Sequence, residues 1–225
     1  MHRAWHILSI ALITAGLVVI LDAGITFADK EPLSAIYGSI RQGEAADELD
    51  KIEAAYPSPA DQALIDAASD ERGRIATLAR SFEARTKNGE PVGRLKVPSM
   101  DGLDVVVIQG TEGGDLQKGP GHYTRTPFPG EGRTVGIAGH RTTYLAPFRH
   151  IDSVEKGDRI VFELPYATFT YEVQRTEVVK PGATHVVRDV GYERLVLSAC
   201  HPLYSAEERY IVFARMTGEQ IRDGR

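Results

Sequence analysis

The strongest constraint on this chain is an apolar segment near its start. From Ile7 to Leu21 the residues are almost wholly apolar, and beyond Asp22 the segment continues through Ala23 to Ala28. At a rise of about 1.5 Å per residue, a helix of about 20 residues matches the hydrocarbon core of a bilayer. We therefore expect residues 7–28 to form a transmembrane signal anchor, with Asp22 near its outer end, where a carboxylate can reach the interface.

The charges on either side of this segment predict its orientation. His2, Arg3 and His6 precede it, whereas Asp29 and Glu31 follow it. Positive charge is retained on the cytoplasmic side of a membrane, so residues 1–6 are expected in the cytoplasm and the rest of the chain outside the cell. A cleavable signal peptide ending at Thr-Phe-Ala is the alternative, although the apolar run is long for one. Both interpretations export the remaining residues.

The next region, residues 29–88, has the period of helices. Apolar residues recur on one face at the 3.6-residue helical spacing from Leu49 onward. Pro57-Ser58-Pro59 must interrupt the pattern because proline removes a helical hydrogen bond, and Ser58 or Asp61 is suited to cap the second helix. We expect an extracellular helical stalk, with a helical hairpin packed on the following domain as the alternative.

A turn-rich sequence at residues 87–91 marks a boundary, and beyond it the apolar residues alternate as they do in strands. Roughly seven or eight short strands in about 130 residues predict a closed or sandwiched β domain over residues 89–217, not a parallel α/β fold. Residues 218–225 are expected to form a C-terminal tail. The expected strands are 94–97, 103–108, 134–138, 159–164, 169–179, 195–197 and 210–214.

Composition excludes one class of function and singles out one residue. The formal net charge is −5, and the basic residues are scattered, whereas a nucleic-acid-binding face needs a concentrated basic stripe. The only cysteine is Cys200, so no internal disulfide can form. Its simplest interpretation is a small buried hydrophobe. Outside the cell, however, an unpaired thiol risks oxidation, so its retention there needs a functional reason.

Three short sequences in the β region carry candidate chemistry. One expected strand ends at His140, a second ends at Cys200, and Arg209 opens the last one. Strand ends are held by a rigid scaffold and stay open to a ligand, which suits catalysis. A thiolate can attack a carbonyl, a histidine can act as base and then as acid, and an arginine can stabilise an oxyanion. Together they describe acyl transfer through a thioester, although each alone is commonly structural.

In the order and spacing of these residues, the segment from about Gly89 to Met216 resembles the sortase family. That family has a histidine at a strand end, a cysteine about sixty residues later and an arginine shortly after it, which are the places of His140, Cys200 and Arg209. The flanking sequences also match: Gly119-Pro120-Gly121-His122-Tyr123, Pro129-Gly130, Gly139-His140-Arg141, Gly157-Asp158, and Ile211-Val212-Phe213-Ala214 after Arg209. The Leu-Ser-Ala-Cys-His-Pro sequence around the cysteine and the Glu-Pro-Leu-Ser-Ala sequence at 31–35 are most similar to class E sortases of actinobacteria, which are Gram-positive.

The resemblance implies an eight-stranded sortase-type β-barrel preceded by the transmembrane helix and the helical stalk. It implies a cysteine transpeptidase that cleaves a Leu-x-x-Thr-Gly sorting signal between Thr and Gly, in class E commonly Leu-Ala-x-Thr-Gly. Cys200 would form the thioester, His140 would protonate the leaving amine and deprotonate the incoming one, and Arg209 would hold the substrate and steady the oxyanion. The implied partners are surface proteins with C-terminal sorting signals and a peptidoglycan precursor amine.

The resemblance is incomplete beside the cysteine. Many sortases carry Thr where this chain has Ala199, so any hydroxyl contribution from that position is missing. Ala199, Tyr144 and His201 flank the expected catalytic residues and are candidates for substrate binding, and Tyr144 and His201 also fit ordinary packing. No spacing typical of a zinc site occurs, and we expect neither a metal nor a cofactor. Three other histidines are expected to be structural or on the surface: His122, His150 and His185.

Two other functions fit parts of the pattern. A membrane-anchored thiol endopeptidase would share the acylation step but release its product to water. A non-catalytic extracellular β module would have Cys200 merely buried, and it leaves the order of His140, Cys200 and Arg209 unexplained. Product analysis with and without an added amine separates the first alternative, and the reactivity of the thiol separates the second.

Overall fold

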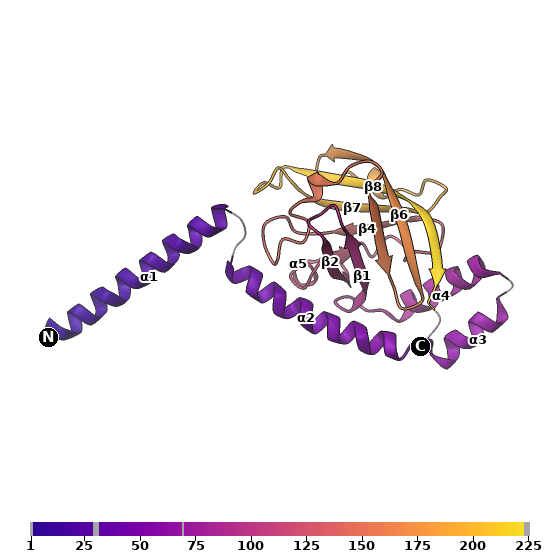
Figure 1. The fold of residues 1–225 in the computed structure, drawn as a ribbon, viewed down its shortest axis with the longest axis horizontal. Helices are drawn as coiled ribbons and strands as arrows, with labels where there is room; N and C mark the ends of the chain where they lie inside the picture. The colour runs from indigo at the N-terminus through magenta and orange to yellow at the C-terminus, as the bar shows by residue number, and fades with distance from the viewer. Residues whose placement is uncertain (1, 29–31, 69, 223–225) are drawn as a thin grey trace.

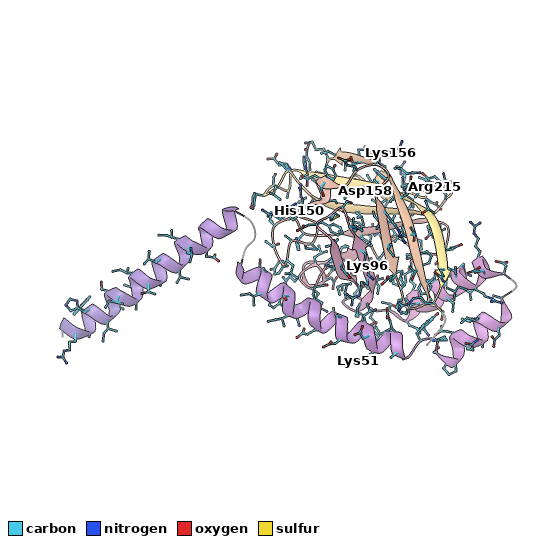
Figure 2. The ribbon with its side chains drawn as sticks, in the orientation of Figure 1. Lys51, Lys96, His150, Lys156, Asp158 and Arg215 are labelled. Atoms are coloured by element: carbon cyan, nitrogen blue, oxygen red, sulfur yellow. The ribbon has the colours of Figure 1, made fainter. Side chains whose placement is uncertain are left out.

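The computed structural model describes residues 2–28, 32–68 and 70–222 (Figure 1). It opens with helix α1 (His2–Ala28), in which Arg3–Gly24 is long and apolar enough to cross a membrane. Figure 1 shows α1 projecting away from the rest of the molecule, and Figure 2 shows its side chains spread along the free helix. The acidic residues expected to follow the span, Asp29 and Glu31, lie outside the described residues.

Three further helices precede the strands: α2 (Pro32–Ala54), α3 (Pro59–Ala67) and α4 (Glu71–Arg85). The break between α2 and α3 falls at the expected prolines, and Ser58, one of the two residues that the sequence offered as caps, is the N-cap of α3. Ser58 Oγ accepts from the Asp61 backbone N at 3.2 Å, and Asp61 Oδ2 accepts from the Ser58 backbone N at 3.0 Å. This reciprocal pair satisfies two amides that the first turn of a helix leaves without partners.

Among the described residues, eight strands form a closed barrel, which confirms the predicted fold. Their order around the barrel is β1-β2-β3-β4-β7-β8-β6-β5. Neighbouring strands are antiparallel except for β2–β3 and β4–β7, which are parallel. The strands are β1 (Pro91–Val97), β2 (Leu103–Gln109), β3 (Gly121–His122), β4 (Thr134–Ala138), β5 (Arg159–Glu163), β6 (Ala167–Val179), β7 (Arg194–His201) and β8 (Glu208–Ile221). The connections contain α5 (Gly113–Leu116) and the 3₁₀ turns η1 (Ile151–Ser153) and η2 (Thr184–Val187).

Helix α4 contributes to the core of the barrel. Ile75, Leu78 and Phe82 are buried in the same apolar cluster as the strand side chains. The ring of Phe82 lies 5.7 Å from that of Phe128 and 5.8 Å from that of Tyr166. Full burial of an apolar side chain of this size contributes about 1.5–3 kcal/mol. Helix α4 is therefore packed on the barrel, which the sequence analysis named as the alternative to the expected stalk.

Helix α2 is docked on the edge of β2 by one amide side chain. Gln42 Oε1 accepts from the Val106 backbone N at 2.9 Å, and Gln42 Nε2 donates to the carbonyls of Val106 at 2.9 Å and Lys118 at 2.6 Å. A Cβ on Gly119 would collide with this amide nitrogen and lie 2.7 Å from the Val106 carbonyl oxygen, so a larger residue there would displace the contact. Further along α2, Leu49 is buried against β2. Helix α2 is thus fixed to the barrel.

Arg222, which follows β8, is also attached to α2. Strand β8 extends to Ile221, so residues 218–221 of the expected tail belong to a strand. The guanidinium of Arg222 binds the carboxylate of Glu53 through both prongs, with Nη1–Oε1 at 2.6 Å and Nη2–Oε2 at 3.0 Å. A bidentate pair of this kind fixes both distance and orientation. Residues 223–225 lie outside the described part of the chain.

Candidate active site

Cys200 and Arg209 lie opposite each other on neighbouring strands. β7 and β8 run antiparallel, and their register pairs Cys200 directly with Arg209. Side chains that are directly opposed in an antiparallel pair point to the same face of the sheet. Cys200 is a free and partly exposed thiol. The guanidinium of Arg209 therefore starts from the same face as this thiol.

Alternation along β7 shows which face this is. Leu197 and Ala199 are buried in the barrel core. Because successive side chains of a strand point to opposite faces, Val196 and Ser198 point outward, and Cys200 continues the outward series. Ala199, a candidate for substrate binding, thus has its methyl group in the core, on the face opposite to the thiol.

His140 reaches the same edge of the barrel from β4. β4 and β7 are parallel, with Ala138 paired to Ser198, and the Gly139 backbone N donates to the Ser198 carbonyl at 3.0 Å. His140 comes two residues after Ala138, and Cys200 comes two residues after Ser198. The three residues expected to be catalytic thus lie at or just beyond the ends of three consecutive strands, β4, β7 and β8, at one end of the barrel.

The imidazole of His140 is partly buried. The His140 ring lies 5.5 Å from the ring of Tyr144, and the backbone carbonyl of His140 accepts a hydrogen bond from the Phe148 N at 2.9 Å. A Cβ on Gly139 would meet the Phe148 ring at 2.6 Å, so the loop can fold back this closely only at a glycine. Burial lowers the pKa of His140 because desolvation disfavours the imidazolium, so the neutral ring is favoured.

Part of the Arg209 guanidinium supports the connection between β7 and β8. Its Nη1 donates to the carbonyls of Ala206 at 2.9 Å and Glu208 at 2.8 Å. Within the described residues, Arg209 donates these hydrogen bonds through Nη1 alone. Nε and Nη2 therefore remain as donors for a ligand carbonyl or oxyanion.

A buried arginine connects the two segments that carry His140 and Cys200. The side chain of Arg141, next to His140, is 3% exposed and pairs through Nη2 with Asp152 Oδ2 at 2.7 Å. Its Nε and Nη2 donate to the Arg149 carbonyl at 3.2 and 3.0 Å. Nη1 lies 3.3 Å from Nδ1 of His201, the residue after Cys200. Because a guanidinium only donates, Nδ1 of His201 is the acceptor in this contact. Sequence reasoning gave Arg141 no role.

The loop after His140 also contacts helix α2. Tyr144, Leu145 and the next residue have φ values of 49°, 68° and 45°, in the left-handed region that non-glycine residues rarely adopt. The Tyr144 N donates to Ser34 Oγ at 3.2 Å, and the Tyr37 and Tyr144 rings are 6.2 Å apart. A Cβ on Gly38 would lie 2.9 Å from the Tyr144 carbonyl carbon. The start of α2 thus supports the loop that carries His140.

A groove of about 340 Å³ begins beside Arg209 and runs along the outer face of β7. Its floor is mostly apolar, and Tyr123 Oη lies 2.8 Å from Ser198 Oγ across it. The sequence did not predict the groove, because most of its wall comes from loops. The one sequence feature that could have indicated it is the alternation along β7, which places Val196, Ser198 and Cys200 on the same outward face. The lining residues are Thr111, Tyr123, Thr124, Arg125, Thr126, Val179, Lys180, Gly182, Ala183, Thr184, Val186, Val187, Val196, Ser198, Arg209 and Ile211.

The remaining histidines lie apart from this constellation. His122 is fully buried, with Nδ1 2.8 Å from Gln109 Oε1. His185 is exposed, as is His150, which Figure 2 labels. Within the described residues, no group of three or more His, Cys, Asp or Glu side chains is arranged to hold a metal ion.

A thiol, an imidazole and a guanidinium thus lie at or just beyond the ends of three neighbouring strands, and the guanidinium residue Arg209 lines the groove. A thiolate can attack a carbonyl carbon, an imidazole can move the proton, and guanidinium donors can hold the oxygen that becomes negative. Fold and site together define a cysteine acyl-transfer enzyme built on a closed β-barrel.

Known sequences identify the family. The family model of the sortase domain matches residues 95–217, more than half of the chain. Sortase D of Bacillus subtilis (strain 168) is 33% identical over 139 residues, which cover 60% of this chain and 67% of that protein. Sortase SrtE2 of Streptomyces coelicolor is 31% identical over 157 residues, which cover 62% of this chain and 60% of that protein. The chain belongs to the sortase family and is a cysteine transpeptidase, as the sequence predicted.

Solved structures agree with this assignment. A sortase D5 transpeptidase from Clostridium perfringens superposes with a TM-score of 0.57 at 26% identity, covering 63% of this chain and 88% of that one. Sortase E1 from Streptomyces coelicolor, solved with a tripeptide in its active site, has a TM-score of 0.57 at 29% identity, covering 60% of this chain and 92% of that one.

Proposed function

We propose that this chain is a membrane-anchored sortase whose catalytic residues are Cys200, His140 and Arg209. Residues 7–28 form the anchor, with the N-terminus in the cytoplasm, and residues 89–217 form the catalytic domain outside the cell. The enzyme cleaves a Leu-x-x-Thr-Gly signal between Thr and Gly and joins the threonine to an amine. The observation that carries this proposal is the register of β4, β7 and β8, which brings the three residues to one end of neighbouring strands.

In the first half-reaction, the Cys200 thiolate attacks the threonine carbonyl carbon. A C–S bond forms while the π electrons move to oxygen, and the free donors of Arg209 stabilise that oxyanion. The intermediate then collapses, the C–N bond to glycine breaks, and the imidazolium of His140 gives its proton to the leaving amine. Burial lowers the pKa of His140, so the imidazolium that gives this proton is disfavoured relative to the neutral ring.

In the second half-reaction, an incoming amine attacks the thioester. Neutral His140 takes a proton from that amine, the C–S bond breaks, and Cys200 leaves as the thiolate. The product contains a new amide bond between threonine and the acceptor. We infer that the acceptor is the amine of a peptidoglycan precursor, because the catalytic domain is then on the side of the membrane where the cell wall lies.

We infer Leu-Ala-x-Thr-Gly as the preferred signal. The inference is supported by the similarity to the Streptomyces proteins named sortase E. The groove is suited to the leucine, because its lining includes the partly exposed apolar side chains of Val179, Ala183 and Val187.

Peptide cleavage by the full chain in detergent tests this function. Quenched fluorescent peptides with Leu-Ala-x-Thr-Gly and Leu-Pro-x-Thr-Gly would be incubated with and without a small amine, beside Cys200→Ala, and the products weighed by mass spectrometry. We expect cleavage after Thr that needs Cys200, an amine-linked product, and a faster reaction of the first peptide. Release of the free acid alone would instead indicate a thiol endopeptidase, and an uncut peptide together with an unreactive thiol would contradict a catalytic role.

A further inference from the structure

The groove beside Arg209 has a charge opposite to that of the chain. The sequence contains 31 acidic and 26 basic residues, giving a net charge of −5. Among the described residues that line the groove, however, the charged ones are Arg125, Lys180 and Arg209, and none is acidic. A concave surface with charges of one sign attracts ligands of the opposite sign.

The three cations differ in how many hydrogen bonds and ion pairs they already make within the protein. Lys180 Nζ pairs with Glu208 Oε1 at 3.0 Å, just outside the groove. Arg209 holds two backbone carbonyls through Nη1. Arg125 is exposed, and the described residues make neither a hydrogen bond nor an ion pair with its guanidinium. Arg125 is therefore the cation of the groove with the greatest capacity for a ligand.

The backbone beside Arg125 is held in place, so its level along the groove is defined. The Tyr123 N donates to the Gly136 carbonyl at 2.9 Å, and Thr126 Oγ1 accepts from the Gly136 N at 3.1 Å. Gly136 is paired with Val196 on β7. Arg125 thus flanks the groove at about the level of Val196. Val196 precedes Cys200 by four residues, about 13 Å at about 3.3 Å per residue.

We propose that Arg125 recognises an acidic side chain in the substrate, at the position immediately before the leucine of the sorting signal. This rests on the proposed function, in which the threonine carbonyl lies at Cys200. An extended peptide rises about 3.3 Å per residue, so the residue before the leucine, four positions before the threonine, lies about 13 Å away, level with Val196. The signal that this enzyme prefers therefore reads Asp/Glu-Leu-x-x-Thr-Gly.

Peptide binding measured separately from cleavage tests this proposal. The full chain carrying Cys200→Ala, in a nonionic detergent, would be titrated against fluorescent peptides with Glu, Gln or Lys before the leucine. We expect the Glu peptide to bind about five-fold more tightly than Gln and the Lys peptide about five-fold more weakly. Because the pair is partly exposed, about 0.5 M salt should largely remove these differences.

Reversing the charge of Arg125 is the second part of the experiment. Arg125→Glu should invert the order of the Glu and Lys peptides, whereas Arg133→Glu should keep the wild-type order. Arg133 makes the matched control because it is exposed and pairs with Asp189 outside the groove, and its reversal changes the net charge equally. Equal binding of the three peptides, with cleavage retained in the wild-type chain, would overturn the acidic preference and leave the transpeptidase intact. If Arg125→Glu binds the Glu and Lys peptides in the wild-type order of affinity, the acidic preference is also overturned. If none of the three peptides binds, both the acidic preference and the proposed function are overturned.

Discussion

Cys200 and Arg209 are direct partners across the β7–β8 ladder, so the backbone alone fixes how close they lie. Directly opposed residues in an antiparallel pair have Cβ atoms about 4.5–5.5 Å apart. A carbonyl attacked by the thiol is therefore within reach of the guanidinium without any movement of a loop. His140, by contrast, lies just beyond the end of β4, where its position depends on the loop that follows.

Arg209→Lys tests whether the guanidinium does more than supply charge. Lysine keeps the charge but loses the planar fork that can hold two carbonyls through Nη1 and a substrate oxygen through its other donors. We expect kcat to fall about 10²-fold, the usual loss for one oxyanion donor, while the thermal midpoint changes little. Steady-state kinetics and thermal unfolding measure the two quantities, and a kcat near that of the wild type would contradict the assigned role.

Arg141→Met tests the connection between the segments that carry His140 and Cys200. Loss of this buried guanidinium removes its hydrogen bonds to the Arg149 carbonyl and to His201, so we expect the free energy of unfolding to fall by about 2–4 kcal/mol and kcat to fall more than ten-fold. Asp152→Asn is the matched control, because this carboxylate is 49% exposed and its loss should cost about 0–1 kcal/mol. Equal effects of the two substitutions on unfolding and on kcat would show that Arg141 acts only through the ion pair.

Two glycines of α2 test whether this helix supports the loop after His140. Nothing lies within 4 Å of a Cβ built on Gly43, so Gly43→Ala should raise the free energy of unfolding by up to about 1 kcal/mol and leave kcat unchanged. At Gly38 the same methyl would lie 2.9 Å from the Tyr144 carbonyl carbon and 3.1 Å from the Leu145 N. We expect Gly38→Ala to displace the loop, lower kcat several-fold and give no gain in stability. If both variants keep the wild-type kcat, the helix does not influence His140.

Buried His122 predicts a specific loss of stability in acid. Burial lowers its pKa to about 4, whereas in the unfolded chain it titrates near 6.5. Between these values the unfolded state binds a proton that the folded state does not, so the free energy of unfolding falls as the pH falls below about 6.5. The loss should reach about 2–3 kcal/mol at pH 4.5. Urea unfolding at pH 7 and pH 4.5 measures it, and His122→Gln should show a correspondingly smaller loss; an equal loss in both chains would rule out His122 as its source.

Strands were predictable where the apolar alternation was continuous. Thr134–Ala138 was predicted to the residue. β7 and β8 run beyond their predicted bounds, 195–197 and 210–214, because polar residues at their ends are held by the neighbouring strands of the barrel. β3 has two residues, too few for any alternation to appear.

The surroundings of the site were less predictable, because they depend on contacts between residues far apart in the chain. The Gln42 amide binds the backbone of Val106, 64 residues away, and a single polar residue on a helix gives no sign of such a contact. Arg141 likewise had no predictable role from its place after His140, because its contact with His201 exists only in the folded chain. The sequence order of His140, Cys200 and Arg209 pointed to the chemistry, and the barrel accounts for how they come together.

The most direct test of the account is the mass of the protein during reaction. Because Cys200 is the only cysteine, a thioester can form at one residue. The full chain would be mixed with a Glu-Leu-Ala-x-Thr-Gly peptide without an acceptor amine, quenched in acid, and weighed intact and after digestion. We predict a mass increase equal to the peptide acid that ends in threonine minus one water, on the peptide containing Cys200, that hydroxylamine removes and Cys200→Ala lacks. Cleavage of the peptide after Thr by the Cys200→Ala chain at the wild-type rate would contradict the account.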